Sequence, residues 1–410
     1  MFKKIFNPNK KVTENEVQEL LSKEDVRYNE LKNSMDVSLI KCVEGDQCVA
    51  WVPFELLFVE SVESAEGYNG LTKEWWETNG IYLGKPLLNL SPHKSLFGFF
   101  INGTTPEPYL KWYREIHTSR NIEPPYDSMS ILNKRQEEFI FMQNELGRGM
   151  QFFVDAPIMA RWNQSAGVFN VKDGHHRAWF LHASGIRNLP VQMNVGEYLR
   201  WRNDENVNPV IKLIEKQDRK EYYTPIPHPY FMELPAYRDK LANMRLDHVL
   251  NYVEPYDFRS KKVIDIGSNL GHASQYFYRR GSDVTCFEPF ADHYEAACVL
   301  NILLHTKCTM YQERFEDHDF NTTYDVGIIL TVFYHYYNNP ILKDDRVRDR
   351  FLEKLDTTID YMLIWESGDD YEGERSFIIE NTKFKKFKHI AWTYGTGKLR
   401  ELGVFYKGIR

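Results

Sequence analysis

Short apolar runs alternate with helix-like stretches along the second half of this 410-residue chain. Residues 262–267, Lys-Val-Ile-Asp-Ile-Gly, form such a run between turn residues, which predicts a buried strand. Four more runs predict strands at 283–287, 308–311, 324–330 and 361–365. Segments 388–394 and 402–407 predict a closing antiparallel pair. Strands that alternate with helices indicate a mostly parallel sheet, which binds its ligands at the carboxyl ends of the strands.

The first half of the chain carries a weaker pattern. Charged residues with apolar spacing predict a helix at 11–33, and 37–43 with 48–52 predict a strand pair. Three prolines within 225–229 break any regular element, so we expect a linker there, followed by a helix from 235 to about 253. The expected divisions are a leader region at 1–65, a first domain at 66–215, a linker and helix at 216–250, and a second domain at 251–410.

A glycine-containing loop follows the first predicted strand of the second domain. Gly267 and Gly271 can adopt backbone angles that other residues avoid, and they let a ligand approach the backbone closely. The helix that begins behind the loop offers free N–H groups and a favourable dipole to an anion. Glu288 ends the next strand about 20 residues later, where a carboxylate can accept hydrogen bonds from ribose hydroxyls. Asn269 replaces the middle glycine of G-x-G-x-x-G, which disfavours a nicotinamide cofactor.

Residues 263–272 resemble motif I of class I S-adenosylmethionine-dependent methyltransferases. The segment I-L-T-V-F-Y-H-Y at 329–336 resembles bacterial enzymes that cap O-antigen polysaccharide, which pair a methyltransferase with a kinase, and more weakly enzymes that modify wobble uridine in tRNA. The resemblance implies a Rossmann-like, seven-stranded α/β domain with S-adenosylmethionine as cofactor. The cofactor-binding residues that it implies are Asp265, Gly267, Ser268, Asn269 and Gly271 on the methionine side, Glu288 at the ribose, and Glu313 in the adenine loop.

The same resemblance places Tyr334 and His335 at the methyl group and the acceptor. Methyl transfer from a sulfonium mainly requires in-line alignment, but a hydroxyl acceptor must also lose a proton, and a histidine of ordinary pKa suits that role. His335 is therefore the candidate base. A phosphate acceptor needs no base, and His335 would then orient or neutralise it; a structural histidine packed among tyrosines remains open. Glu366 and Asp369, after the fifth strand, are expected to be solvated loop acids.

The first domain carries a second motif. Residues 169–173 predict a strand, and a helix is expected from His175 to about 184. A helix N-terminus beside two histidines and an arginine suits a phosphate. The motif resembles the nucleotide-binding motif of the ParB/sulfiredoxin superfamily, in the D-G-H-H-R form of its free-serine-kinase branch; its residues are Asp173, Gly174, His175, His176 and Arg177.

That resemblance implies a smaller α+β domain and, in the kinase branch, phosphotransferase activity with ATP and magnesium. The catalytic glutamate of that branch is not placed by the motif; the candidates are Glu107, Glu115, Glu138 and Glu145. A phosphate-recognition module and a purely structural domain stay open as alternatives.

The composition of the chain bears on whether it binds nucleic acid, a membrane or a metal ion. The net charge of −7 disfavours a protein that holds nucleic acid through its phosphates. No run reaches the ~18 apolar residues of a membrane span, and no signal-peptide stretch opens the chain, so a cytoplasmic location is expected. The five cysteines form no C-x-x-C pair and no cluster with zinc spacing, so no metal site is expected.

These observations favour a methyltransferase of polysaccharide biosynthesis that acts on a hydroxyl or phosphate oxygen of a cell-surface glycan or its precursor. The partner would be a glycan or a phosphorylated small molecule that the first domain phosphorylates or holds. Two alternatives remain: a methyltransferase of tRNA or other nucleic acid, and a non-catalytic scaffold that binds nucleotide or cofactor as a sensor.

Overall fold

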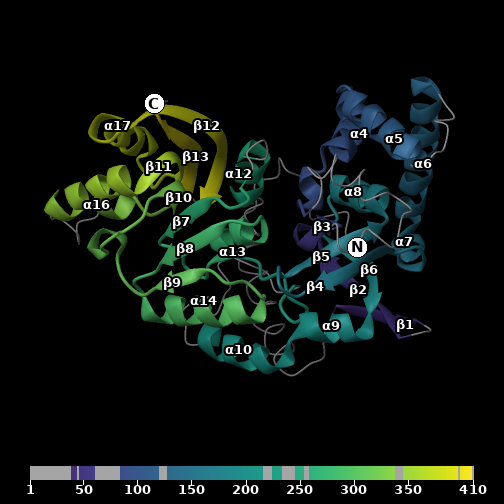
Figure 1. The fold of residues 1–410 in the computed structure, drawn as a ribbon, viewed down its shortest axis with the longest axis horizontal. Coiled ribbons are helices and arrows are strands. Elements are labelled where there is room, and N and C mark those ends of the chain that lie inside the picture. The colour runs from purple at the N-terminus through teal and green to yellow at the C-terminus, as the bar shows by residue number, and fades with distance from the viewer. Residues whose placement is uncertain are drawn as a thin grey trace. The chain divides into compact units, whose positions relative to one another are not determined.

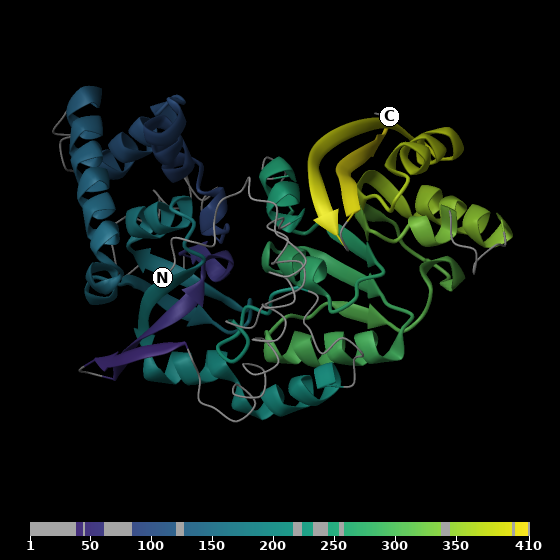
Figure 2. The ribbon, with the colours of Figure 1, turned by 180° about the vertical axis from the view of Figure 1, so that it is seen from behind.

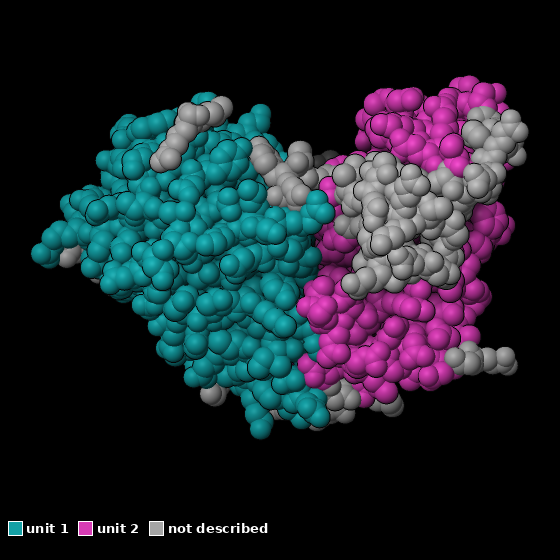
Figure 3. All heavy atoms as spheres, in the orientation of Figure 1, with its two compact units in different colours: residues 1–35, 204–226, 233–410 teal, residues 36–203, 227–232 magenta. Residues whose placement is uncertain are grey.

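The computed structural model describes residues 38–43, 46–60, 84–119, 127–215, 224–232, 245–253, 258–337, 345–395 and 398–408. The chain forms two compact units (Figure 3), which are described separately. Unit 2 comprises Asp36–Asn203 and Pro227–Met232; unit 1 comprises Met1–Met35, Asp204–Ile226 and Glu233–Arg410. The predicted helix at 11–33 and the first ten residues of the helix predicted from 235 to about 253 lie outside the described residues, whereas the rest of the second helix is present as α12 (Arg245–Val253).

Unit 2 is built on a six-stranded mixed sheet with the order β1-β2-β6-β4-β5-β3. Its strands are β1 (Leu39–Val43), β2 (Gln47–Pro53), β3 (Leu57–Val59), β4 (Ile158–Asn163), β5 (Val168–Asp173) and β6 (Asn188–Asn194). Side chains alternate along β4, where Ile158, Ala160 and Trp162 are buried and Met159 and Arg161 are exposed, as a half-buried strand requires. The predicted pair at 37–43 and 48–52 is present as β1 and β2.

The sheet of unit 2 contains strands from both sides of the domain boundary that was expected at residue 65. Strand β2 pairs with β6 over seven residues, and β3 pairs in parallel with β5, so the strands before residue 60 belong to the same sheet as those after residue 157. A leader region that ends at 65 is therefore not a separate part of the fold, because its apolar strands are covered only within this sheet.

Helices pack around the unit 2 sheet. They are α4 (Ser91–Asn102), α5 (Glu107–Ser119), α6 (Ser128–Arg148), α7 (Gln151–Asp155), α8 (His175–Ala183) and α9 (Val195–Arg202), with short 3-10 turns η2 (Phe54–Leu56) and η4 (Leu87–Asn89). Asp127 caps α6 by accepting a hydrogen bond from the Ser130 N–H at 2.9 Å. Helices α4, α5 and α6 share a small core that includes Leu96, Tyr109 and Ile131.

Unit 1 contains the seven-stranded sheet that the sequence predicts, and it has a Rossmann-like α/β fold. Its strands are β7 (Lys262–Ile266), β8 (Asp283–Phe287), β9 (Thr309–Tyr311), β10 (Tyr324–Leu330), β11 (Ile359–Glu366), β12 (Phe384–Gly395) and β13 (Lys398–Lys407), in the order β12-β13-β11-β10-β7-β8-β9. The first five pair in parallel, and β13 runs antiparallel to both β11 and β12.

Helices cover both faces of this sheet (Figures 1 and 2). Apolar residues of α12 (Arg245–Val253) and α13 (His272–Arg279) pack on the face that includes Val263. Those of α16 (Asp345–Thr358) and α17 (Tyr371–Asn381) pack on the face that includes Ile264. Because consecutive residues of β7 point to opposite faces, a continuous apolar strand is buried on both sides.

The boundaries of the two units differ from the expected domain boundaries. Helix α10 (Val207–Glu215) and the 3-10 turn η5 (Asp204–Asn206), which were expected in the first domain, belong to unit 1, where α10 packs against α14 (Ala291–Leu303; Figure 1). Residues 227–232 belong to unit 2, and the buried His228 is bonded through Nε2 to the Arg202 carbonyl at 2.7 Å. No helix among the described residues is both long and apolar enough to cross a membrane.

Candidate functional site

The loop between β7 and α13 has three residues with positive φ: Gly267 (70°), Asn269 (51°) and Gly271 (76°). Its start is fixed by β8, because the N–H groups of Gly267 and Ser268 both donate to the Phe287 carbonyl, at 2.8 and 3.0 Å. A Cβ at Gly267 would lie 2.7 Å from Val332 Cγ2, so only glycine fits this turn without a shift of its neighbour. The loop thereby lies beside the segment that follows β10.

Glu288 holds this loop from the end of β8. The side chain is buried, and its two carboxylate oxygens accept the N–H groups of Asn269 at 2.8 Å and Phe290 at 3.0 Å. A carboxylate can accept about four hydrogen bonds. Glu288 therefore retains acceptor capacity for the paired hydroxyls of a ribose.

Two polar side chains at this loop, Asp265 and Ser268, differ in their hydrogen bonding. Asp265 is buried and accepts a hydrogen bond from Ser274 Oγ at 2.5 Å, which ties β7 to α13. Burial raises the pKa of the Asp265 carboxyl to about 6, although the Ser274 hydroxyl and the Arg245 charge oppose this shift. The buried Ser268 Oγ has no hydrogen-bond partner among the described residues, and no side chain caps α13. The start of α13 can therefore accept a polar or anionic group.

Glu313 lies in the loop after β9 that is expected to face an adenine. Its carboxylate pairs with His318 Nδ1 at 2.8 Å, and its side chain is 38% exposed. The loop continues into η6 (Phe315–Asp317). Beside the loop, the rings of Phe287 and Tyr311 are stacked at 5.2 Å.

Tyr334 and His335 open the short helix α15 (Tyr334–Tyr337) after β10. The His335 N–H donates to the Val332 carbonyl at 3.0 Å, so the helix is held next to the residue that contacts Gly267. The two rings lie 3.9 Å apart. Burial and the Arg400 charge lower the pKa of His335, which keeps the imidazole neutral at pH 7. The structure thus brings the candidate base and the glycine loop to the same edge of the sheet.

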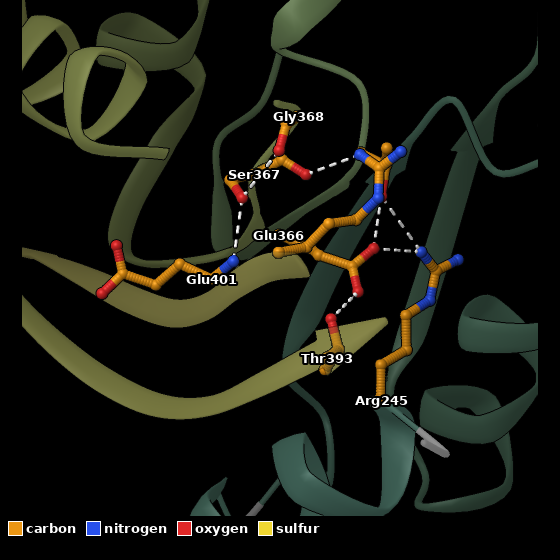
Figure 4. Close-up of polar contacts among 8 residues, drawn as sticks. Arg245, Glu366, Ser367, Gly368, Thr393 and Glu401 are labelled. Carbon is orange, nitrogen blue, oxygen red and sulfur yellow. Dashed lines mark hydrogen bonds and ion pairs between the residues drawn. The ribbon is translucent and has the colours of Figure 1, made fainter. Parts of the chain in front are cut away.

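A buried ion pair closes this edge. Glu366, the last residue of β11, is fully buried, and Oε2 accepts from Arg245 Nη1 at 2.7 Å and from the Thr331 hydroxyl (Figure 4). Oε1 accepts from Thr393 Oγ1 of β12 at 2.7 Å. Thr331 itself has a φ of 62°, an uncommon value for a β-branched residue. The network joins α12, β11, β12 and the residue that follows β10.

The expectation that Glu366 is a solvated loop acid is therefore wrong, because its carboxylate is enclosed by donors from three other elements. The expectation holds for Asp369, whose side chain is 56% exposed and pairs with Lys398. Both acids follow the same strand, and their sequence context does not distinguish them.

The two residues after Glu366 are held by a second network. Arg400 Nη1 donates to the Ser367 carbonyl at 2.9 Å, and the Glu401 N–H donates to Ser367 Oγ at 2.9 Å (Figure 4). The Gly368 N–H donates to Glu374 Oε1 at 2.9 Å. Burial raises the pKa of Glu374 to about 7. A Cβ at Gly368 would overlap Tyr334, so this glycine admits the ring of the candidate site residue.

The D-G-H-H-R motif of unit 2 joins β5 to α8. Gly174 has a φ of 90° at the start of the helix, and no side chain caps the first turn. The Arg177 guanidinium reaches back to Asp173 at 3.0 Å. The His176 Nε2 lies 2.9 Å from the Tyr109 hydroxyl. Burial lowers the pKa of His175 to about 4 and holds that of His176 well below its usual range. The uncapped N–H groups of this turn suit an anion.

The four candidate glutamates of unit 2 lie on α5 and α6, where each has a basic neighbour: Glu107 with Arg114, Glu115 with Lys111, Glu138 with Arg135 and Glu145 with Arg148. A fifth acid was missed. Glu60 follows β3, is buried, and lies 3.8 Å from Lys172 Nζ on the parallel neighbour β5. Its signal in the sequence is an acid that directly follows the apolar run 56–59. Glu60 and Asp173 therefore end neighbouring parallel strands.

Metal-binding geometry is not found in the described parts of the chain: no three His, Cys, Asp or Glu side chains there are grouped to hold an ion.

No protein-family model matches the chain, and no curated protein matches it. Similar solved structures include magnesium protoporphyrin IX methyltransferase (ChlM) from Synechocystis PCC 6803 with bound SAM, with 16% identity over 40% of this chain and 78% of that one and a TM-score of 0.33. The N-methyltransferase NodS from Bradyrhizobium japonicum WM9 has 11% identity over 40% and 96%, with a TM-score of 0.33. The bifunctional kinase-methyltransferase WbdD has 20% identity over 48% and 45%, with a TM-score of 0.38.

Proposed function

We propose that unit 1 binds S-adenosylmethionine and transfers its methyl group to a hydroxyl or phosphate oxygen. The observation that carries this proposal is the loop from Gly267 to Gly271, which turns through positive φ angles in front of an uncapped helix and is held by the buried Glu288. The buried Ser268 hydroxyl, which has no hydrogen-bond partner among the described residues, adds a donor at the start of α13. Asn269 in place of a middle glycine separates this loop from nicotinamide-binding loops.

Different residues of unit 1 would bind the cofactor, accept a proton and orient the acceptor. The start of α13 and Ser268 would hold the methionyl carboxylate, and Glu288 would accept hydrogen bonds from the ribose hydroxyls. When bound, the cofactor supplies a methyl group that is already activated by its positively charged sulfur. His335, neutral at pH 7, can accept the proton of a hydroxyl acceptor or donate a hydrogen bond to a phosphate. Tyr334, whose ring is tilted against that of His335, would orient the acceptor.

We further infer that the acceptor is a cell-surface glycan or its precursor, and that unit 2 phosphorylates it or holds it in phosphorylated form. The resemblance of 329–336 to O-antigen-capping enzymes supports the acceptor class. The uncapped start of α8 supports phosphate binding in unit 2. If ATP with magnesium is the ligand, Glu60 is the candidate carboxylate for the transfer, since it ends the strand next to Asp173.

The test is calorimetric titration of the whole protein with S-adenosylhomocysteine and with NAD, followed by transfer of radiolabelled methyl groups to extracted glycan and to total RNA. We expect binding of the homocysteine compound alone and label in the glycan. NAD binding in its place would overturn the cofactor proposal, and label in RNA would overturn the acceptor class.

The coupling of the two units is tested separately by Asp173→Ala. We expect this variant to bind S-adenosylhomocysteine normally but to methylate only an acceptor that is already phosphorylated. If it methylates the unphosphorylated acceptor as well as the wild type does, the two units do not act in sequence.

A further inference from the structure

His93 is a buried histidine that the sequence motifs do not include. It lies in the first turn of α4 and is fully buried. Neither of its ring nitrogens has a hydrogen-bond partner within the described part of the chain. A neutral imidazole carries one donor and one acceptor, and burying both unpaired destabilises the folded protein. Such a group indicates a ligand that completes the site.

The unpartnered ring lies at the start of α8. Its centroid is 4.5 Å from that of His176 and 5.7 Å from that of His175, both in the first turn of that helix. Helix α5 also packs against the ring, and its Trp112 and Tyr109 rings meet His93 edge-on at 4.8 and 5.8 Å. His93 is therefore surrounded by aromatic rings of α5 and by the histidines of the D-G-H-H-R motif.

The charged groups around His93 are mostly basic. His175 and His176 come from α8, and Arg135 of α6 lies 5.9 Å from the centre of the Tyr109 ring. The acids nearby are already paired, Glu138 with Arg135 and Asp173 with Arg177. Burial and these basic neighbours hold the pKa of His93 well below its usual range, so it is neutral without a ligand. An anion in this space would supply the missing counter-charge and favour the protonated imidazole.

We propose that His93 is the proton-accepting end of a phosphate site at the first turn of α8, and that a phosphate monoester or inorganic phosphate binds there together with one proton. The proposal rests on the phosphate-binding role proposed for the D-G-H-H-R motif and adds a residue from another helix to it. The phosphate accepts from the α8 N–H groups and from one N–H group of protonated His93. No covalent step is involved.

The probe is inorganic phosphate, titrated calorimetrically into the full-length protein in two buffers of different ionisation enthalpy. At pH 7.5 and above this probe is mainly a dianion, so a bound proton is taken up either by the protein or by the phosphate itself. The His93→Phe variant distinguishes the two, because selective binding of the monoanion would persist without His93. We expect uptake of about one proton per phosphate, and an affinity that falls up to about tenfold per pH unit between pH 7.5 and 9. Binding without proton uptake would overturn the proposal, and this measurement needs no variant.

The variant His93→Phe keeps the aromatic volume and removes both nitrogens. We expect it to lose the proton uptake and the pH dependence, and to bind phosphate at least about tenfold more weakly, the effect of losing a charge-assisted hydrogen bond. The control is His182→Gln, which changes a half-buried histidine at the other end of α8 that stacks on Phe54 at 4.0 Å. It should bind phosphate like the wild type.

A third variant separates this inference from the proposed function. If Arg177→Ala weakens phosphate binding while His93→Phe does not, the motif binds phosphate and the role of His93 is wrong. If the wild type binds no phosphate, both proposals for unit 2 fail, whereas the methyltransferase proposal for unit 1 is unaffected.

Discussion

Arg245 Nη1 lies 2.7 Å from Glu366 Oε2, which joins the helix before the first strand of unit 1 to the end of its fifth strand. The Arg245 side chain is 13% exposed and that of Glu366 is fully buried. A buried ion pair contributes little net stability when both partners are present, but removal of one partner leaves an uncompensated charge. The pair therefore acts mainly to fix α12 against the carboxyl edge of the sheet.

This pair gives the first prediction. Arg245→Met should lower the free energy of unfolding by about 3–5 kcal/mol, because Glu366 keeps its burial and loses its counter-charge. The double variant Arg245→Met/Glu366→Gln should recover most of that loss. Urea unfolding measures both. The control is Lys398→Met, which breaks an ion pair with both side chains more than half exposed and should cost at most about 1 kcal/mol. Equal losses in the two single variants would contradict the structural role of Arg245.

The second prediction concerns the glycine loop. Gly267→Ala places a Cβ 2.7 Å from Val332 Cγ2 at a φ of 70°, so it should destabilise unit 1 by about 1–3 kcal/mol and weaken S-adenosylhomocysteine binding. Gly281→Ala is the matched control: its φ is 83°, but its Cβ would meet Arg259 at only 3.4 Å. It should show the backbone strain without the loss of binding. Partial rescue of Gly267→Ala by Val332→Ala would identify the steric contact as the cause.

His335 gives the third prediction, for a hydroxyl acceptor. His335→Gln should lower kcat by about 10²–10⁴, the usual contribution of a general base, and leave S-adenosylhomocysteine binding unchanged. Because burial and Arg400 lower the pKa of His335, the wild-type rate should fall only below about pH 6.5. A pH–rate profile of kcat/KM measures this. If the acceptor is an anionic phosphate, His335→Gln should instead change KM more than kcat. The wild-type profile of kcat/KM against pH should then lack the fall below about pH 6.5.

The fourth prediction is a pH dependence of stability. Burial raises the pKa of Glu374 from 4.5 to about 7, so the folded protein binds this proton more tightly than the unfolded chain does. The free energy of unfolding should therefore fall as pH rises from about 4.5 to about 7. Glu374→Gln mimics the protonated side chain and should be about 1–3 kcal/mol more stable than the wild type at pH 8, with little difference at pH 5.

The control for this prediction lies on the same helix. Glu372 is exposed in the first turn of α17, and Glu372→Gln should change stability by at most about 0.5 kcal/mol, with no trend between pH 5 and 8. Thermal or urea unfolding at both pH values compares the two variants. If Glu374→Gln is destabilised at pH 8, the carboxylate is satisfied by its surroundings and its burial is not a penalty.

The parts of the fold that the sequence predicts are those with a local signal. The strand at 262–266 and the turn after it follow from an apolar run and two glycines, and the closing antiparallel pair predicted at 388–394 and 402–407 is present as β12 and β13. The state of Glu366 does not follow, because its partners Arg245 and Thr393 lie on other elements, and Arg245 is 121 residues away. Glu60 and β1 to β3 were assigned to a leader region for the same reason, since β3 pairs with a strand more than 100 residues later.

The position of helix α10 in the chain determines whether the two units can be separated from each other. The chain leaves unit 2 at Asn203, forms α10 within unit 1, returns to unit 2 at residues 227–232, and then enters unit 1 again. The α10 side chains Val207, Val210 and Leu213 are buried in unit 1. A fragment that begins at residue 233 would keep every strand of the seven-stranded sheet and still leave the surface of α14 under α10 exposed to water. The two units therefore cannot be separated by a single cut of the chain, because α10 of unit 1 precedes the last segment of unit 2 in the sequence.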